Sequence, residues 1–231
     1  MVERDVEPNP LEFRFLQLMK DLRNSDSVTV MGEVRGGVSA EMLDSWAGLS
    51  MLEELYDVVP DPSLADHHIR YSEFGIHWAE VGDSVGAGGE FVLRELAGAI
   101  MSGPPDSENV RDDAQRDLFR QLRVIDYQPE GGVAAFSAVR LNGRFIDPRV
   151  WVYRFPYGAF ELDLDYRGYL EALLLTKGFY GWQFLYSDVQ LTGAKYEPIV
   201  RLIRTGLDFL AAVFPDSRYE ELEVRLSERQ Q

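Results

Sequence analysis

The segment from Asp163 to Asp188 constrains the fold more than any other part of the sequence. Asp165 is placed to cap the N terminus of a helix, Lys177 falls in its last turn, and Gly178 follows as a residue that tolerates left-handed backbone. Five aromatic side chains then occur within the eight residues of positions 179–186. Between cap and glycine, apolar residues recur at the spacing of one helical face: Tyr166, Tyr169, Leu170, Leu173 and Leu174. The segment predicts a buried helix followed by a corner that docks into the core.

Helices are also expected at both ends of the chain. Asn9 and Glu12 stand at the two positions of a capping box around Pro10, and the apolar stripe that follows ends near residue 24. A second helix is predicted from Ser39 to a point before Pro60. A long helix opens at position 198, and the charged tail from position 217 adds a polar one.

Short stretches rich in β-branched and aromatic residues lie between these helices and predict strands. Strands that follow one another without intervening helices indicate antiparallel pairing. The predicted class is therefore α+β, with a mixed, mainly antiparallel sheet flanked by helices, in a single domain over residues 1–231. Proline-containing, acidic residues 101–113 are expected to form an exposed insertion or linker. The predicted strands are residues 27–34, 75–81, 90–96, 122–127, 132–139 and 149–154.

The net charge is −16, from 39 acidic and 23 basic residues. This charge argues against nucleic acids and anionic membrane surfaces as partners, because both attract basic proteins. An acidic chain can steer a basic protein partner, or the charge can serve solubility alone, and the sequence leaves both readings open. There are no cysteines, which excludes disulfides and thiolate sites. Without a signal-peptide pattern or a membrane-spanning run, we expect a cytoplasmic protein.

The three histidines, His67, His68 and His77, lie close together and could suggest a metal site with neighbouring carboxylates. Their spacing matches no common ligand pattern, and two adjacent histidines diverge by about 100° on a helix. His77 is also expected on the strand face opposite Trp78. We therefore predict neither a metal nor a cofactor. The carboxylates considered with the histidines are Asp66, Glu73 and Glu80.

The loop from Gly82 to Gly89, GDSVGAGG, resembles a phosphate-binding loop only superficially. Such a loop continues with a lysine and a hydroxyl residue, whereas this one continues with Glu90 and Phe91. We interpret it as the connection of a β-hairpin. An enzyme alternative stays open, in which a small hydrolase uses carboxylates around this loop, with or without a metal held by His67 and His77.

Three segments resemble the SUKH superfamily of fungal cell-wall-assembly regulators and bacterial immunity proteins. Residues 60–78 resemble its proline, short helix and Gly-x-x-Trp strand, with Phe74–Trp78 as the best match. The segment GAGGEFVL, residues 86–93, is similar to the glycine-rich hairpin that follows in the family. RVIDYQPEGGVAAF, residues 123–136, is similar to a later strand pair in which an acidic residue precedes a glycine turn.

This resemblance implies a non-catalytic domain that binds another protein. Immunity members neutralise a toxin by covering its surface, often with acidic side chains that face a basic nuclease site. We accordingly expect a protein-binding module, not an enzyme, with a basic toxin or nuclease as partner. A regulatory scaffold of the fungal kind is the alternative within the same family. The expected partner-binding residues are Trp78, Glu80, Asp83 and Glu90.

Overall fold

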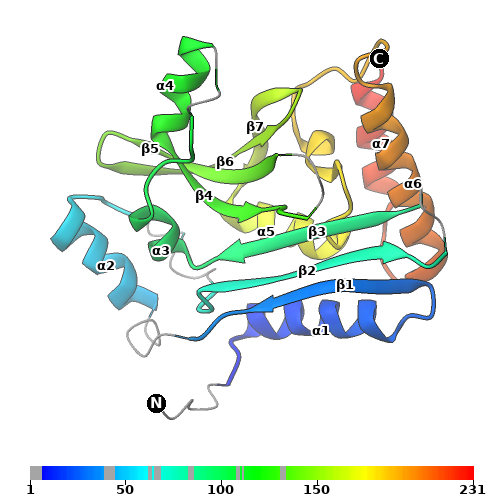
Figure 1. Cartoon of the computed structure of the whole chain (residues 1–231), viewed down its shortest axis with the longest axis horizontal. Coiled ribbons are helices and arrows are strands. Elements are labelled where there is room, and N and C mark those ends of the chain that lie inside the picture. The colour runs from blue at the N-terminus through cyan, green and yellow to red at the C-terminus, as the bar shows by residue number, and fades with distance from the viewer. Residues whose placement is uncertain are drawn as a thin grey trace.

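The fold is built on one antiparallel sheet whose strands are arranged in chain order (Figure 1). The structure is a computed structural model that describes residues 7–38, 45–61, 64, 69–82, 86–107, 110, 112–130 and 134–231, with side chains in the second helix from residue 50 onward. Every pair of neighbouring strands is antiparallel, so the α+β class is confirmed but the sheet is not mixed. The strands are β1 (Val28–Arg35), β2 (Glu73–Glu80), β3 (Gly88–Arg94), β4 (Leu122–Tyr127), β5 (Ala135–Asn142), β6 (Phe145–Arg154) and β7 (Gly158–Asp165).

Helices cover the sheet and supply most of the core. The main core combines one face of the sheet with residues from α1, α5, η3, α6 and α7, while α4 covers a small separate cluster over β4, β5 and β6. None of the described helices is long and apolar enough to cross a membrane. The helices are α1 (Pro10–Asn24), α2 (Ser45–Tyr56), α3 (Leu96–Met101), α4 (Asp113–Gln121), α5 (Tyr166–Thr176), the 3-10 helix η3 (Trp182–Tyr186), α6 (Glu197–Val213) and α7 (Glu220–Arg229).

The capping box predicted for α1 is present and has a second role. The Asn9 side chain accepts a hydrogen bond from the Glu12 amide, and the Glu12 carboxylate accepts one from the Asn9 amide, both at 2.8 Å. Glu12 is completely buried and also pairs with Arg70 at 2.6 Å. Burial opposes ionisation of Glu12, but the hydrogen bonds from Arg70 and Asn9 outweigh it and hold the pKa of Glu12 below its ordinary value. The cap thereby ties α1 to the segment that precedes β2.

The helix predicted after Asp165 is α5, and the Asp165 carboxylate accepts a hydrogen bond from the Gly168 amide at 2.7 Å as expected. The left-handed turn that ends α5 begins one residue earlier than predicted, since Lys177 has φ = 50° and Gly178 has φ = 69°. Every residue of the following η3 is buried. The aromatic corner therefore docks in the core as the sequence predicted.

Three elements were not predicted. The strand expected over residues 90–96 stops at Arg94, because the Glu95 carboxylate accepts hydrogen bonds from the Ala97 and Gly98 amides and caps α3. The helix α4 begins at the end of the proposed insertion, and its Phe119 packs against aromatic rings of β5 and β6. The seventh strand, β7, occupies a stretch in which no strand or helix is predicted from the sequence. The start predicted for α2 at Ser39 lies outside the described residues.

Candidate functional site

The most distinctive internal feature of the protein lies where β3 and β4 separate. These strands are paired only at Val92–Tyr127 and Leu93–Asp126. Beyond that point β3 bonds instead to the corner after α5, with the Glu90 amide donating to the carbonyl oxygen of Gly178 at 3.0 Å. The corner can approach because residue 89 is glycine, where a Cβ would meet that same carbonyl oxygen at 2.5 Å. A small polar pocket lies near this split, lined by residues at the ends of β4, β5 and β6 and by Gln183 of η3.

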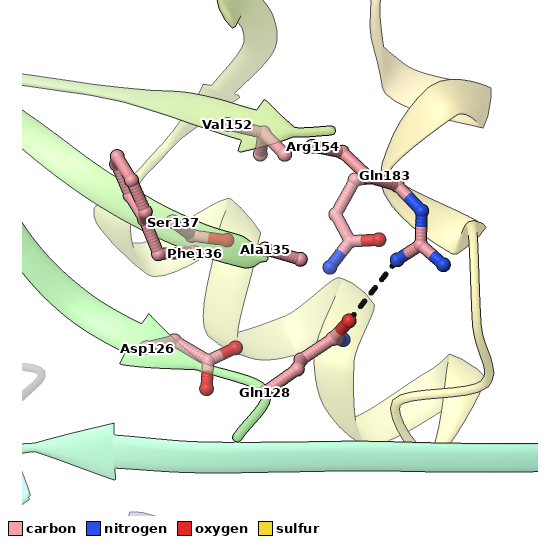
Figure 2. Close-up of a pocket in the computed structure, with 8 residues that line it drawn as sticks. All are labelled: Asp126, Gln128, Ala135, Phe136, Ser137, Val152, Arg154 and Gln183. Atoms are coloured by element: carbon pink, nitrogen blue, oxygen red, sulfur yellow. Dashed lines mark hydrogen bonds between the residues drawn. The ribbon is translucent and has the colours of Figure 1, made fainter. Parts of the chain in front are cut away.

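Figure 2 shows that the long polar side chains of this pocket come from three different elements and converge. Arg154 is the last residue of β6, Gln128 follows β4, and Gln183 belongs to η3; each is 5% exposed. The Arg154 Nη1 donates to Gln128 Oε1 at 3.1 Å. As formed by its described residues, the pocket has no room for a water molecule. Its lining consists of Asp126, Gln128, Ala135, Phe136, Ser137, Val152, Arg154 and Gln183.

Arg154 is a buried cation that has no anionic partner among the residues the structure describes. Among the described residues no carboxylate forms an ion pair with it, and its one side-chain hydrogen bond goes to the neutral amide of Gln128. Burial lowers the pKa of Arg154, and the nearby hydroxyls of Tyr157 and Tyr180 only partly offset that effect. A guanidinium has five N–H donors and stays charged, so leaving it buried and unpaired costs several kcal/mol. Such a group is a candidate for binding a ligand.

Asp126 lies on the same side of the sheet and is also buried, but its oxygens are occupied. The Tyr169 hydroxyl lies 2.5 Å from Asp126 Oδ2, and the Val92 amide donates to Oδ1 at 2.8 Å. Burial raises the pKa of Asp126 to about 7, and the negative charge of Glu90 raises it further. The hydrogen bonds from Tyr169 and Val92 act in the opposite direction and lower this pKa, but they do not outweigh burial. These bonds join β3, β4 and α5 at the point where the sheet splits, so Asp126 has a structural role.

The structure does not place two of the expected partner-binding residues on the surface. Trp78 is fully buried, where it stacks on Phe209 with ring centroids 5.6 Å apart, and its indole N–H donates to the Lys177 carbonyl at 2.8 Å. Its position on the core-facing side of β2 follows from strand alternation. Trp78 is therefore a core residue, and this corrects the expectation that it contacts a partner.

Glu90 is 1% exposed, which corrects the second expectation. Its carboxylate accepts from the Glu130 amide at 3.0 and 3.2 Å, and its carbonyl oxygen accepts from the Gln128 side chain at 2.9 Å. Glu90 thus holds the segment after β4 against β3. Glu80 is half-buried and accepts from the Ala87 amide at 2.9 Å, within the hairpin. Asp83 lies outside the described residues.

The histidines do not form a metal site in the described part of the chain. No group of three or more potential ligands occurs among those residues. His77 lies on β2 opposite Glu90 in the strand register, while His67 and His68 fall outside the described residues. The part of the metal alternative that rests on His67 is therefore not placed by the structure.

A second feature lies at the opposite end of β6, where Val59, just after α2, forms a bridge with Phe145 at the start of that strand. Figure 1 shows α2 and the β5–β6 hairpin on the same side of the molecule. The Val59 amide donates to the Arg144 carbonyl oxygen at 2.6 Å, and Arg144 pairs with Asp57 at 3.1 Å. Three large apolar side chains there are more than half exposed. We call this region the apolar–acidic patch, and it comprises Glu53, Glu54, Leu55, Tyr56, Asp57 and Phe145.

Sequence reasoning missed both regions for the same reason. The patch joins residues that are far apart in the chain, and the pocket joins three side chains from separate elements, so neither has a characteristic spacing. For the patch, the sequence offers one signal, the adjacent apolar residues Leu55 and Tyr56 near the end of a helix. For the pocket, it offers Arg154 at the end of an apolar strand. Comparisons of the chain with family models, curated proteins and solved structures return no match.

Proposed function

We propose that the protein is a non-catalytic protein-binding module whose apolar–acidic patch binds a basic protein surface. The observation that carries this proposal is the exposure of Leu55, Tyr56 and Phe145, at 65%, 52% and 59%, where α2 meets the β5–β6 turn. The bridge between Val59 and Phe145 brings the chain just after α2 to the start of β6. Single exposed apolar residues are ordinary on protein surfaces, whereas several in one region among charged residues are typical of an interaction site. Tyrosine and phenylalanine are also enriched in such sites.

Charge favours a basic partner over a neutral one. Among the described residues of the patch, Glu53 and Asp57 lie beside Arg144, and Glu54 is a further exposed carboxylate on α2. The pairs of Arg144 with Glu53 and Asp57 join half-exposed side chains, so each is worth only about 0–1 kcal/mol and a partner can displace it. The net charge of −16 adds long-range attraction, which raises association rates at low salt.

The resemblance to the SUKH superfamily supports a narrower form of this proposal. In that form the protein is a cytoplasmic immunity protein, and the partner is a basic toxin or nuclease that it neutralises by covering its surface. A regulatory scaffold would use the same surface with a different partner. The identity of the captured protein distinguishes the two.

The experiment is affinity capture from a lysate of the source cells, at low and at moderate salt, followed by mass spectrometry. Wild type is compared with the variant Leu55→Ser/Phe145→Ser and with a control, Met31→Ser/Val224→Ser, which changes two equally exposed apolar residues on β1 and α7. We expect a basic protein that wild type and control both capture, that the patch variant loses, and that moderate salt releases. Equal capture by all three proteins, or a loss confined to the control, would contradict the proposal.

A further inference from the structure

The polar pocket around Arg154, at the buried end of β6, is separate from the apolar–acidic patch. We propose that the pocket around Arg154 binds the carboxylate group of a small ligand, with Gln128 occupying the position of that carboxylate in the free protein. The two sites lie at opposite ends of one strand, so a ligand at Arg154 and a protein at the patch do not compete for surface. The juxtaposition of Arg154, Gln128 and Gln183 in Figure 2 carries the argument.

The Arg154 guanidinium makes few bonds for a buried cation. Its side chain is 5% exposed, and among the described residues Gln128, a neutral amide, is its one side-chain hydrogen-bond partner. By contrast, Arg14 and Arg149 have carboxylate partners, and their side chains are at least half exposed. A buried guanidinium usually has a carboxylate or phosphate in its plane, opposite an edge from which its N–H donors point. Among the described residues, no anion takes that position at Arg154.

The anion would take the position of the Gln128 side-chain amide. Gln128 Oε1 accepts from Arg154 as one oxygen of a carboxylate would, but as a neutral group it gives a weaker bond. Its Nε2 donates to the Glu90 carbonyl oxygen at 2.9 Å, so the amide is held in place by one further bond. The Gln183 side chain faces the same space from η3 (Figure 2). A ligand carboxylate that displaces the Gln128 amide would gain a charged partner and keep a neighbouring amide.

The size and surroundings of the pocket favour a small anion of low charge. The pocket has no room for a water molecule as it stands, its lining includes the buried acid Asp126, and buried Glu90 lies near enough to Asp126 to influence its pKa. A doubly charged phosphate would be larger and more strongly repelled by these acids than a singly charged, planar carboxylate. Moving Gln128 also breaks its bond to Glu90, which weakens the net affinity. We therefore expect binding of a simple carboxylate in the millimolar range, where one ion pair with few other contacts normally falls.

The test is a titration of the ¹⁵N-labelled full chain with sodium acetate and, separately, with sodium chloride at equal concentration. We expect acetate alone to produce saturable shifts of the Arg154 Nε–H signal and of the Gln128 and Gln183 side-chain amide signals. Equal, non-saturating shifts in both salts would overturn the proposal. Saturable shifts confined to other residues would overturn it as well.

Two variants and one control decide whether the shifts report this pocket. Gln128→Glu supplies an internal carboxylate next to Arg154, so it should make the protein at least about tenfold less responsive to acetate. The acetate response, and not the melting temperature, is the readout for this variant, because the new ion pair is opposed by the loss of the Gln128 Nε2 bond to the Glu90 carbonyl oxygen. Arg154→Gln should lose the acetate response, and Arg149→Gln, an exposed arginine on the same strand, should keep it. Should Arg154→Gln fail to fold, Gln128→Glu alone remains decisive. An undiminished acetate response in Gln128→Glu would contradict the proposal.

Discussion

The two ends of β6 present opposite surroundings. At Phe145 the strand begins beside exposed apolar and acidic side chains, and at Arg154 it ends in a buried polar pocket. Ten residues of extended chain separate these ends by about 30 Å. The same strand therefore holds one region suited to a large partner and another suited to a small ligand.

The contribution of a charged side chain to stability differs between the two ends of β6 because its burial differs. The carboxylates beside Arg144 are solvated, so they add little to stability and remain available for association. Arg154 and Asp126 are desolvated, so each imposes a cost that only hydrogen bonds or a bound counter-charge can reduce. We expect substitutions at the exposed end to change binding, and substitutions at the buried end to change stability and its dependence on pH.

The largest expected difference is between an aromatic residue of the buried core and an aromatic residue of the exposed patch. Trp78→Ala removes a buried indole whose N–H donates to the Lys177 carbonyl oxygen, and should lower the free energy of unfolding by about 3–5 kcal/mol. Tyr56→Ala in the patch should change it by less than about 0.5 kcal/mol. Urea unfolding followed by fluorescence measures both. A loss below about 1 kcal/mol for Trp78→Ala would show that this residue is not part of the core.

Asp126 should give the buried end a pH-dependent stability. Its pKa is about 7 when folded and 3.8 ordinarily, so between these values the folded protein retains a proton that the unfolded chain releases. The free energy of unfolding should therefore fall as pH rises from about 4 to 7 and stay low above 7. Asp126→Asn, which resembles the protonated acid, should be more stable than wild type by roughly 2–4 kcal/mol at pH 8 and about equal to it at pH 4.

The measurement is the difference in unfolding free energy between wild type and Asp126→Asn across this pH range, which cancels the groups that both proteins share. Asp57→Asn, an exposed acid in the patch, serves as the control and should show no such trend. A constant difference between wild type and Asp126→Asn from pH 4 to 8 would mean that Asp126 keeps its ordinary pKa.

A smaller effect is expected on binding at the exposed end. Glu53→Gln/Glu54→Gln should slow association with the captured basic partner several-fold at low salt and flatten the dependence of the rate on salt. The matched change Glu220→Gln/Glu221→Gln on α7 alters the net charge equally but lies outside the patch. Stopped-flow or biosensor rates measure both. If the α7 variant slows association as much, the overall charge steers the partner and the patch does not.

The smallest expected effect is on the stability of the patch itself. Arg144→Ala breaks the pairs with Glu53 and Asp57, whose side chains are more than half exposed, and should lower the free energy of unfolding by no more than about 0.5 kcal/mol. Thermal or urea unfolding provides the value. A loss above about 2 kcal/mol would show that Arg144 fixes α2 to the sheet, and that charges at the exposed end of β6 also contribute to stability.

Local signals in the sequence were enough to predict the elements with strong caps and long apolar stripes. The capping box around Pro10 and the Asp165 cap both appear in the structure, together with the helices α1 and α5. The strand β4 also matches its predicted bounds. These features depend on residues within a few positions of one another, which a single sequence displays directly.

The missed elements had weak or competing local signals. In β7 the apolar residues Phe160 and Leu162 alternate correctly, but they alternate with Glu161 and Asp163, which are depleted in strands. In α4 only Phe119 is buried, so its acidic start looked like part of a linker. Both elements form because tertiary packing overrides weak propensity, and a sequence does not reveal that packing.

The candidate sites depended even more on tertiary structure. Glu90 looked like an exposed hairpin carboxylate because its loop is glycine-rich and polar, yet the segment after β4 folds over it and buries it. Arg154 gave no sign in the sequence of being buried opposite a neutral amide, because its partner Gln128 is 26 residues away in the chain. Burial and pairing of charges are properties of the whole fold.

The most direct test of a binding surface at the α2 end of the sheet is hydrogen exchange, measured by mass spectrometry on the free protein and on its complex with the captured partner. We predict that the partner protects residues 50–59 and 143–147, which carry the apolar–acidic patch, and leaves the β2–β3 hairpin unchanged. Protection confined to residues 77–91, with the patch exchanging as in the free protein, would contradict the account.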